Sequence, residues 1–115
     1  MKKKIIVITG DPNSINSEII YKCWKRTNKS TKKEIYFISN KNLLQKQFKA
    51  LGYSTDLIGV KNINKKENDD CFKILDIDLK FKKTFNVNYK DASKYIIKCL
   101  NYGHNVCKSN HLMIS

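Results

Sequence analysis

The residues best suited to chemistry lie directly after the first apolar run, in the stretch GDPNSINSEI (10–19). Gly10 can adopt a positive φ or let a second backbone approach closely. Asp11 and Pro12 follow it, and a helix is predicted to begin a few residues later. Backbone N–H groups at a helix N-terminus can hold an anion or a polar ligand group. The candidate ligand-facing loop is therefore Gly10, Asp11, Pro12 and Asn13, and the alternative is a purely structural strand-to-helix turn.

Two common phosphate-binding motifs are excluded at this loop. The sequence GxxxxGK[ST], whose backbone cradles nucleotide phosphates, is not present. The dinucleotide fingerprint GxGxxG would need two more glycines than the loop contains. The loop therefore carries no specific nucleotide signature of its own.

The cysteines and histidines do not form a metal-binding pattern. The four cysteines form no CxxC pair, and they are Cys23, Cys71, Cys99 and Cys107. We expect free and mostly buried thiols, as is usual in a reducing compartment. His104 and His111 flank the last cysteine, but no second cluster completes the four ligands of a zinc site. No metal site is predicted.

The formal net charge of +13 raises nucleic acid as a partner. The basic residues are 22 lysines and one arginine, although arginine is the residue suited to bidentate contacts with bases and phosphates. Lys, Asn and Ile together make 50 of the 115 residues, which an AT-rich genome explains. The lysines are spread along the chain without a dense block. We therefore expect solvated lysines, with a nucleic-acid surface as the less favoured alternative.

The elements that must position the candidate loop alternate between strand and helix. Apolar runs predict strands, and apolar residues at helical spacing predict helices, over 4–9 (strand), 14–27 (helix), 34–39 (strand), 40–51 (helix), 56–60 (strand), 72–79 (strand) and 89–107 (helix). Short connections between alternating strands and helices are typical of a parallel sheet with crossover helices. The length suits one small domain, so an α/β fold is predicted.

The helices are expected to bury one face each. The predicted inward residues are Ile15, Ile19, Cys23 and Trp24 in the first helix, Leu44, Phe48 and Leu51 in the second, and Ala92, Tyr95, Ile96, Cys99, Leu100 and Val106 in the third. Ser14 or Asn16 is expected to cap the first helix, and Gly52 to end the second. The sequence NKSTKK (28–33) is expected to be a polar link.

No membrane association is predicted. No apolar run approaches the roughly 18 residues of a membrane-spanning helix. The apolar run Ile5–Ile8 is too short for a signal peptide, and no small-residue cleavage site follows it. A cytoplasmic location is therefore expected. Near the other end, His111–Ile114 is predicted to begin a last strand with no helix after it.

The candidate loop resembles a known signature. GDPNSINSEI is similar to the sequence G-E-P-A-G-I-G-P-E/D-L that follows the first strand of the 4-hydroxythreonine-4-phosphate dehydrogenase family. The positions that match in kind and spacing are Gly10, Asp11, Pro12, Ile15, Glu18 and Ile19. Ser14, Asn16 and Ser17 stand where the family has two glycines and a proline.

A second resemblance lies near the C-terminus. The sequence KDASKYIIKCLNYG (90–103) is similar to the family's helix with A-x-x-Y, here Ala92 and Tyr95. The tail NHLMIS (110–115) falls where the family has the strand that leads into its T-x-P-[IV]-x-K loop. The resemblance spans nearly the whole chain but only the first third of the family's usual length.

The resemblance implies both a fold and an activity. The fold is part of a parallel-sheet α/β/α domain similar to the isocitrate and isopropylmalate dehydrogenases, truncated, with residues 1–115 as the N-terminal portion of the first domain. The activity is an NAD-dependent oxidation and decarboxylation of 4-phosphohydroxy-threonine in pyridoxal phosphate biosynthesis. The family works as a homodimer and binds a divalent metal and a small phosphorylated substrate.

The family's catalytic, metal and substrate residues come after the matched region. We therefore expect residues 1–115 alone to be an inactive N-terminal fragment that binds neither NAD nor metal. The alternative is a small basic α/β binding module, with nucleic acid as its ligand.

Overall fold

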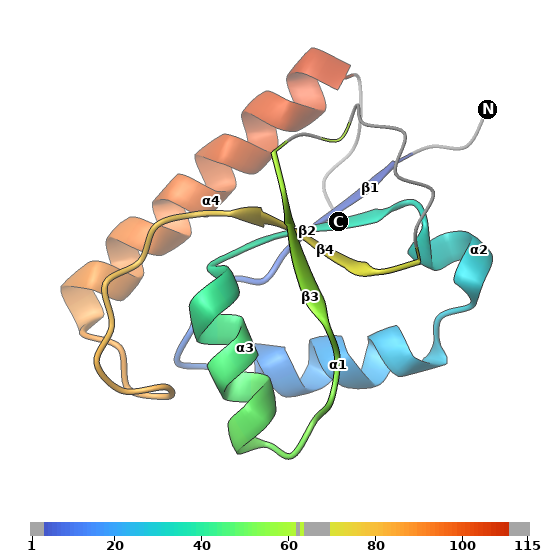
Figure 1. Cartoon of the computed structure of the whole chain (residues 1–115). Coiled ribbons are helices and arrows are strands. Elements are labelled where there is room, and N and C mark those ends of the chain that lie inside the picture. The colour runs from blue at the N-terminus through green and yellow to red at the C-terminus, as the bar shows by residue number, and fades with distance from the viewer. Residues whose placement is uncertain (1–3, 62, 64–69, 111–115) are drawn as a thin grey trace.

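The computed structural model describes residues 4–61, 63 and 70–110, which form a parallel sheet between helices (Figure 1). The strands are β1 (Ile5–Ile8), β2 (Ile35–Ser39), β3 (Leu57–Val60) and β4 (Phe72–Asp76), and the helices are α1 (Asn16–Arg26), α2 (Lys29–Lys32), α3 (Lys41–Ala50) and α4 (Tyr89–Asn110). All strand pairs are parallel, in the order β1-β2-β4-β3. The predicted α/β class is confirmed. The strand expected over His111–Ile114 lies outside the described residues.

Helices cover both faces of the sheet, which is why the strands are almost continuously apolar. α1 and α3 lie on one face, and α4 crosses the other (Figure 1). On the first face an aromatic cluster fills the space: the Phe37 and Phe72 rings stack with centroids 3.9 Å apart, and Trp24 meets Phe72 edge-on at 4.9 Å. On the second face, the core combines sheet residues with Tyr95 and Cys99 of α4. Neither sheet face could be left in water without exposing this apolar surface.

The predicted inward face of α1 is wrong for three of its four residues. Ile15 is 68% exposed and Ile19 is 47% exposed, and Cys23 also faces solvent. Trp24 is buried, as predicted, and the other buried or partly buried residues are Ser17, Ile20 and Tyr21. Both sets have helical spacing, so periodicity alone could not choose between them. The packing of the large Trp24 ring into the aromatic cluster decides the rotation of the helix.

Other differences from the sequence prediction are local. The expected polar link forms the short helix α2, because the Asn28 side chain accepts a hydrogen bond from the Thr31 N–H (2.8 Å). β4 ends at Asp76 rather than at residue 79, since its neighbour β2 ends opposite it at Ser39. Leu51 and Leu100, expected inward, are 36% and 50% exposed. No helix among the described residues is long and apolar enough to cross a lipid bilayer.

The predicted end of α3 at Gly52 is confirmed. Gly52 has φ +77°, a conformation that residues with a side chain rarely adopt. Its N–H donates to the Lys49 carbonyl (3.1 Å), and the next N–H, of Tyr53, donates to the Phe48 carbonyl (2.8 Å). The Phe48 and Tyr53 rings also touch, with centroids 6.2 Å apart. Together these contacts form a Schellman motif, in which the last carbonyls of the helix are satisfied by the turn that ends it.

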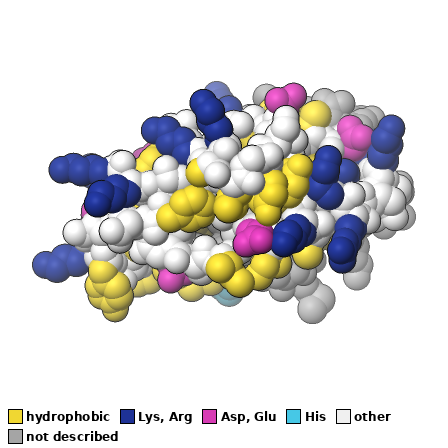
Figure 2. Space-filling model, turned by 90° about the horizontal axis from the view of Figure 1, so that it is seen from below, with side chains coloured by type: hydrophobic (Ala, Val, Ile, Leu, Met, Phe, Trp, Pro, Cys, Tyr) yellow, Lys and Arg dark blue, Asp and Glu magenta, His cyan; other side chains and the backbone are white. Residues whose placement is uncertain are grey.

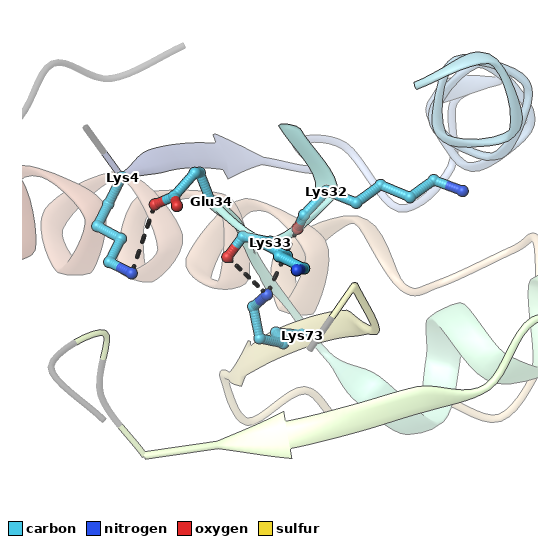
Figure 3. A network of polar contacts seen from close by, with 5 residues as sticks. All are labelled: Lys4, Lys32, Lys33, Glu34 and Lys73. Atoms are coloured by element: carbon cyan, nitrogen blue, oxygen red, sulfur yellow. Dashed lines mark hydrogen bonds and ion pairs between the residues drawn. The ribbon is translucent and has the colours of Figure 1, made fainter. Parts of the chain in front are cut away.

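Lys73 in β4 is the least expected core residue, with 1% of its surface exposed. Its Nζ donates to the carbonyls of Lys33 (3.0 Å) and Lys32 (3.4 Å) at the end of α2, as Figure 3 shows. The ammonium also lies 4.9 Å from the centre of the Tyr36 ring. Beside it, Lys4 and Glu34 form an ion pair with an N–O distance of 3.5 Å. Two carbonyls and an aromatic face therefore replace the water that a buried ammonium loses.

Substitutions of Lys73 separate its packing from its charge. Lys73→Ala removes a buried stem and is expected to lower the free energy of unfolding by about 2–5 kcal/mol. Lys73→Met keeps a similar volume without the solvation cost of a buried ammonium, so it should lose less than about 1.5 kcal/mol. Urea unfolding of the three proteins measures both values. Equal losses in the two variants would contradict this and assign the stabilisation to the ammonium contacts.

Candidate functional site

The loop after β1 has the backbone that its glycine predicts. Gly10 has φ +77°, and a Cβ atom added there would lie 2.9 Å from Nδ2 of Asn16. That Nδ2 donates to the Thr9 carbonyl (2.9 Å), which holds the start of α1 against the end of β1. Any side chain at residue 10 would therefore meet both an unfavourable φ and a steric clash. The positive φ predicted as one possibility for Gly10 is confirmed, and the atom that approaches it closely belongs to the Asn16 side chain and not to a second backbone.

Neither predicted cap of α1 acts as one. The residue preceding the helix is Ile15, which makes no side-chain cap hydrogen bond. The Asn16 side chain is directed back to Thr9, and the Ser14 hydroxyl donates to the Asp11 carbonyl (2.7 Å) while accepting from the Asn16 N–H (3.2 Å). Glu18 lies in the first turn, as expected, and pairs with Lys22 (2.9 Å).

Three of the four candidate residues make hydrogen bonds within the protein, and Pro12 and Asn13 hold the loop to distant segments. Asp11 accepts the Asn13 N–H on Oδ1 (2.9 Å), which closes a local turn. The Pro12 carbonyl accepts from Nε2 of Gln47 in α3 (2.8 Å). Asn13 pairs with the backbone of Val87 twice, through Oδ1 (2.7 Å) and Nδ2 (2.9 Å). The side-chain amide of Asn13 thereby pairs with both backbone groups of a residue 74 positions away in sequence.

A small cavity lies beneath the loop, at the carboxyl edge of the sheet. Its volume is about 10 Å³, and its lining comes from five elements: Thr9, Gly10, Asp11, Pro12, Asn16, Ser17, Ser39, Leu43, Leu44, Gln47 and Tyr95. Three of the four candidate residues line it, and Asn13 does not. A volume of this size accommodates about one water-sized group. The enclosed space is thus too small for a dinucleotide or a phosphorylated amino acid.

Ser17 gives the cavity an unpaired polar group. The residue is 5% exposed, and its Oγ has no hydrogen-bond partner among the described residues. A buried hydroxyl without a partner costs roughly 1–3 kcal/mol, so a polar group entering the cavity would gain this contact. In the sequence, Ser17 was noted only because it stands where the family signature has a proline. Its helical spacing with Trp24 is the signal that could have shown it to be buried.

Tyr95 lines the cavity from α4 and links this helix to the end of β2. Its hydroxyl donates to Oγ of Ser39 (3.3 Å) and accepts from the Asn40 N–H (2.8 Å). Burial, together with the neighbouring Cys99, raises the pKa of Tyr95 to about 12. Burial also raises the pKa of the Cys99 thiol to about 11. Both groups are therefore neutral at physiological pH, and neither is poised as a base or a nucleophile.

The described residues offer no other catalytic or metal-binding cluster. In residues 4–61, 63 and 70–110, no three His, Cys, Asp or Glu side chains are grouped so as to hold a metal ion. Cys99 and Cys107 are buried, Cys71 is half-buried and Cys23 is exposed, and all are free thiols. Sequence reasoning also missed Gln47, a buried amide whose Nε2 donates to both Pro12 and Thr84. No sequence signal distinguishes it from the exposed polar residues of α3.

Comparison with solved structures places this geometry in a known fold. A protein from Salmonella typhimurium, provisionally described as a 4-hydroxythreonine-4-phosphate dehydrogenase, superposes with a TM-score of 0.78 at 16% identity over 99% of this chain. The 4-hydroxythreonine-4-phosphate dehydrogenase of Klebsiella pneumoniae gives 0.76 at 17% identity over 98%. The chain has the fold of these dehydrogenases. It spans 36% of the length of each.

The similarity is structural, because no protein-family model and no curated protein sequence matches the chain. The expected likeness to this dehydrogenase fold over part of its length is confirmed. The assignment of Gly10 to Asn13 as ligand-facing stays a prediction.

The Asn13 side chain should be required to order the segment before α4. Asn13→Ala removes two hydrogen bonds to Val87, and we expect a loss of about 1–3 kcal/mol of unfolding free energy. Amide exchange at Val87 should accelerate, because its N–H loses its acceptor. The exposed Asn86→Ala is a matched control with little expected effect. Unchanged exchange at Val87 in Asn13→Ala would disprove the link.

The raised pKa of Tyr95 predicts a loss of stability at alkaline pH. Between its ordinary value of 10 and about 12, the unfolded chain releases the phenol proton while the folded protein retains it. Unfolding is therefore favoured as pH rises through this range, by about 3 kcal/mol in total. Denaturant unfolding of Tyr95→Phe should lack this part of the decline, whereas exposed Tyr89→Phe should retain it. Parallel pH profiles for wild type and Tyr95→Phe would refute the prediction.

Proposed function

We propose that this chain is the N-terminal portion of an NAD-dependent dehydrogenase that oxidises and decarboxylates 4-phosphohydroxy-threonine. The observation that carries the proposal is the superposition of 99% of the chain on a dehydrogenase fold, with a TM-score of 0.78. The loop that resembles the family signature supports it, since Gly10 has the positive φ that a glycine at this position permits. Homodimer formation, a small phosphorylated substrate and a cytoplasmic location belong to the same proposal.

In this proposal the chain contributes a scaffold and one wall of a larger site. In parallel α/β sheets, ligands bind outside the carboxyl ends of the strands, where Gly10 to Asn13 lie. Asn13 and Gln47 fix the loop's position through Val87 and Thr84. A ligand bound above the loop would meet a preorganised backbone, which reduces the entropy lost on binding.

The candidate loop and the cavity beneath it do not fit a site for the family's NAD, and the described residues do not fit a complete site for its divalent metal. They contain no group of three metal-ligating side chains, and the cavity beneath the loop holds about 10 Å³. The loop also lacks the glycines of a dinucleotide fingerprint. We therefore infer that this chain is inactive by itself.

Two measurements test the proposal. The coding sequence beyond the codon for Ser115 should contain, in phase or shifted by a frame, the family's P-x-x-K loop and later a Gly-His-Thr sequence. Purified chain 1–115 should form no NADH from NAD, a divalent metal and 4-phosphohydroxy-threonine. The absence of the motifs would remove the dehydrogenase assignment, and turnover by the isolated chain would remove the inactive-fragment assignment.

A further inference from the structure

The segment between β4 and α4 contains a hollow much larger than the cavity beneath the candidate loop. It measures about 880 Å³, and its lining includes Lys80, Lys82 and Lys83 together with the amides of Asn86 and Asn88. This volume lies in the range of typical ligand sites, roughly 300–1,000 Å³. The lysines supply charge, and the asparagines supply further hydrogen-bonding groups for an anionic ligand.

The positive charge continues along the first turns of α4. An adjoining hollow of about 330 Å³ shares Lys80 and is also lined by Lys94 and Lys98. Against these five lysines stand two carboxylates, Asp78 and Asp91. The ion pairs recorded for the described residues, those of Glu18 and Glu34, lie elsewhere in the fold. The two hollows therefore present a net positive surface to solvent.

Two exposed aromatic residues flank the lining residues in the sequence. Tyr89 is 82% exposed and Phe85 is 42% exposed, and they adjoin the lining residues Asn88 and Asn86 in sequence. The ring of Phe81 already has a partner, because Nζ of Lys46 lies 5.2 Å from its centre. Figure 2 shows basic and hydrophobic side chains close together at the left end of the molecule, the side on which Figure 1 draws this segment. An exposed ring next to lysines offers a base a face on which to stack.

The segment is anchored at two points. Nε2 of Gln47 donates to the Thr84 carbonyl (2.8 Å), and Asn13 makes two hydrogen bonds with Val87. These anchors lie on either side of Phe85. The backbone that carries the rings and lysines is therefore held in place before any ligand binds, which favours binding.

We propose that the segment 80–98 binds single-stranded nucleic acid. Lys80, Lys82 and Lys83 contact phosphates, and Phe85 and Tyr89 stack on unpaired bases. A duplex keeps its bases stacked on one another and offers no free face to these rings, so a single strand is the favoured ligand. The proposal does not depend on the dehydrogenase assignment. A free nucleotide shares the same chemistry and is distinguished by the test.

The charge contribution is tested with a fluorescent oligothymidylate and the full chain, by anisotropy over a salt series. The slope of log affinity against log salt is expected to fall by about 2 when Lys80, Lys82 and Lys83 are all changed to Gln. The matched control changes three exposed lysines elsewhere, Lys25, Lys29 and Lys33, to Gln and removes the same charge. This control should leave the slope nearly unchanged. Equal effects of the two triple variants would overturn the proposal in favour of diffuse charge.

The stacking contribution is tested with Tyr89→Ala and Phe85→Ala. Each is expected to weaken oligothymidylate binding about tenfold. Ile19→Ala, at an exposed position on α1 outside the segment, should have no effect. Competition by a duplex of equal length or by inorganic polyphosphate should be weaker than by unlabelled oligothymidylate. Equal competition by polyphosphate, tighter binding of ATP than of the oligonucleotide, or no binding at low salt would each refute a single-strand site.

Discussion

The carboxyl edge of the sheet depends on Asn40, the residue that follows β2. Its backbone N–H donates to the Tyr95 hydroxyl, its Nδ2 donates to the Ile77 carbonyl and its Oδ1 accepts from the Leu43 N–H. One buried side chain and its own backbone thus connect β2 with the chain after β4, the start of α3 and the middle of α4. Buried polar groups must be paired, and here the pairing also determines where these elements meet. Two of the residues joined in this way, Leu43 and Tyr95, also line the cavity beneath the loop after β1.

In the loop after β1, polar groups of three of the candidate residues make hydrogen bonds within the protein. Asp11, Pro12 and Asn13 each make a hydrogen bond within the protein, and those of Pro12 and Asn13 reach distant segments. Ser17 is the exception, since its buried hydroxyl has no partner among the residues described. A hydroxyl that could still bind a polar group therefore lies inside the small cavity.

Much of the fold followed from simple patterns, and the failures have specific physical causes. Strands rich in β-branched residues and a glycine after β1 were enough to predict the parallel sheet and the backbone at Gly10. The rotation of α1 could not be predicted in this way, because Trp24 and Ile19 both fit a helical period. Only the packing of Trp24 in the aromatic cluster shows which of the two faces the core. Lys73 was unpredictable for a related reason. A lysine within an alternating strand normally faces water, and here the carbonyls at the end of α2 and the Tyr36 ring help to make its burial tolerable.

The double hydrogen bond between Asn13 and Val87 joins residues 74 positions apart, and Asn40 and Tyr95 are separated by 55. Contacts of such large separation form late and slow the folding of a domain, since a long stretch of chain must first be closed into a loop. During synthesis, the loop after β1 leaves the ribosome early but has no partner for Asn13 until Val87 follows. This loop is thus made well before Val87 but is among the last parts of the described fold to reach its final conformation.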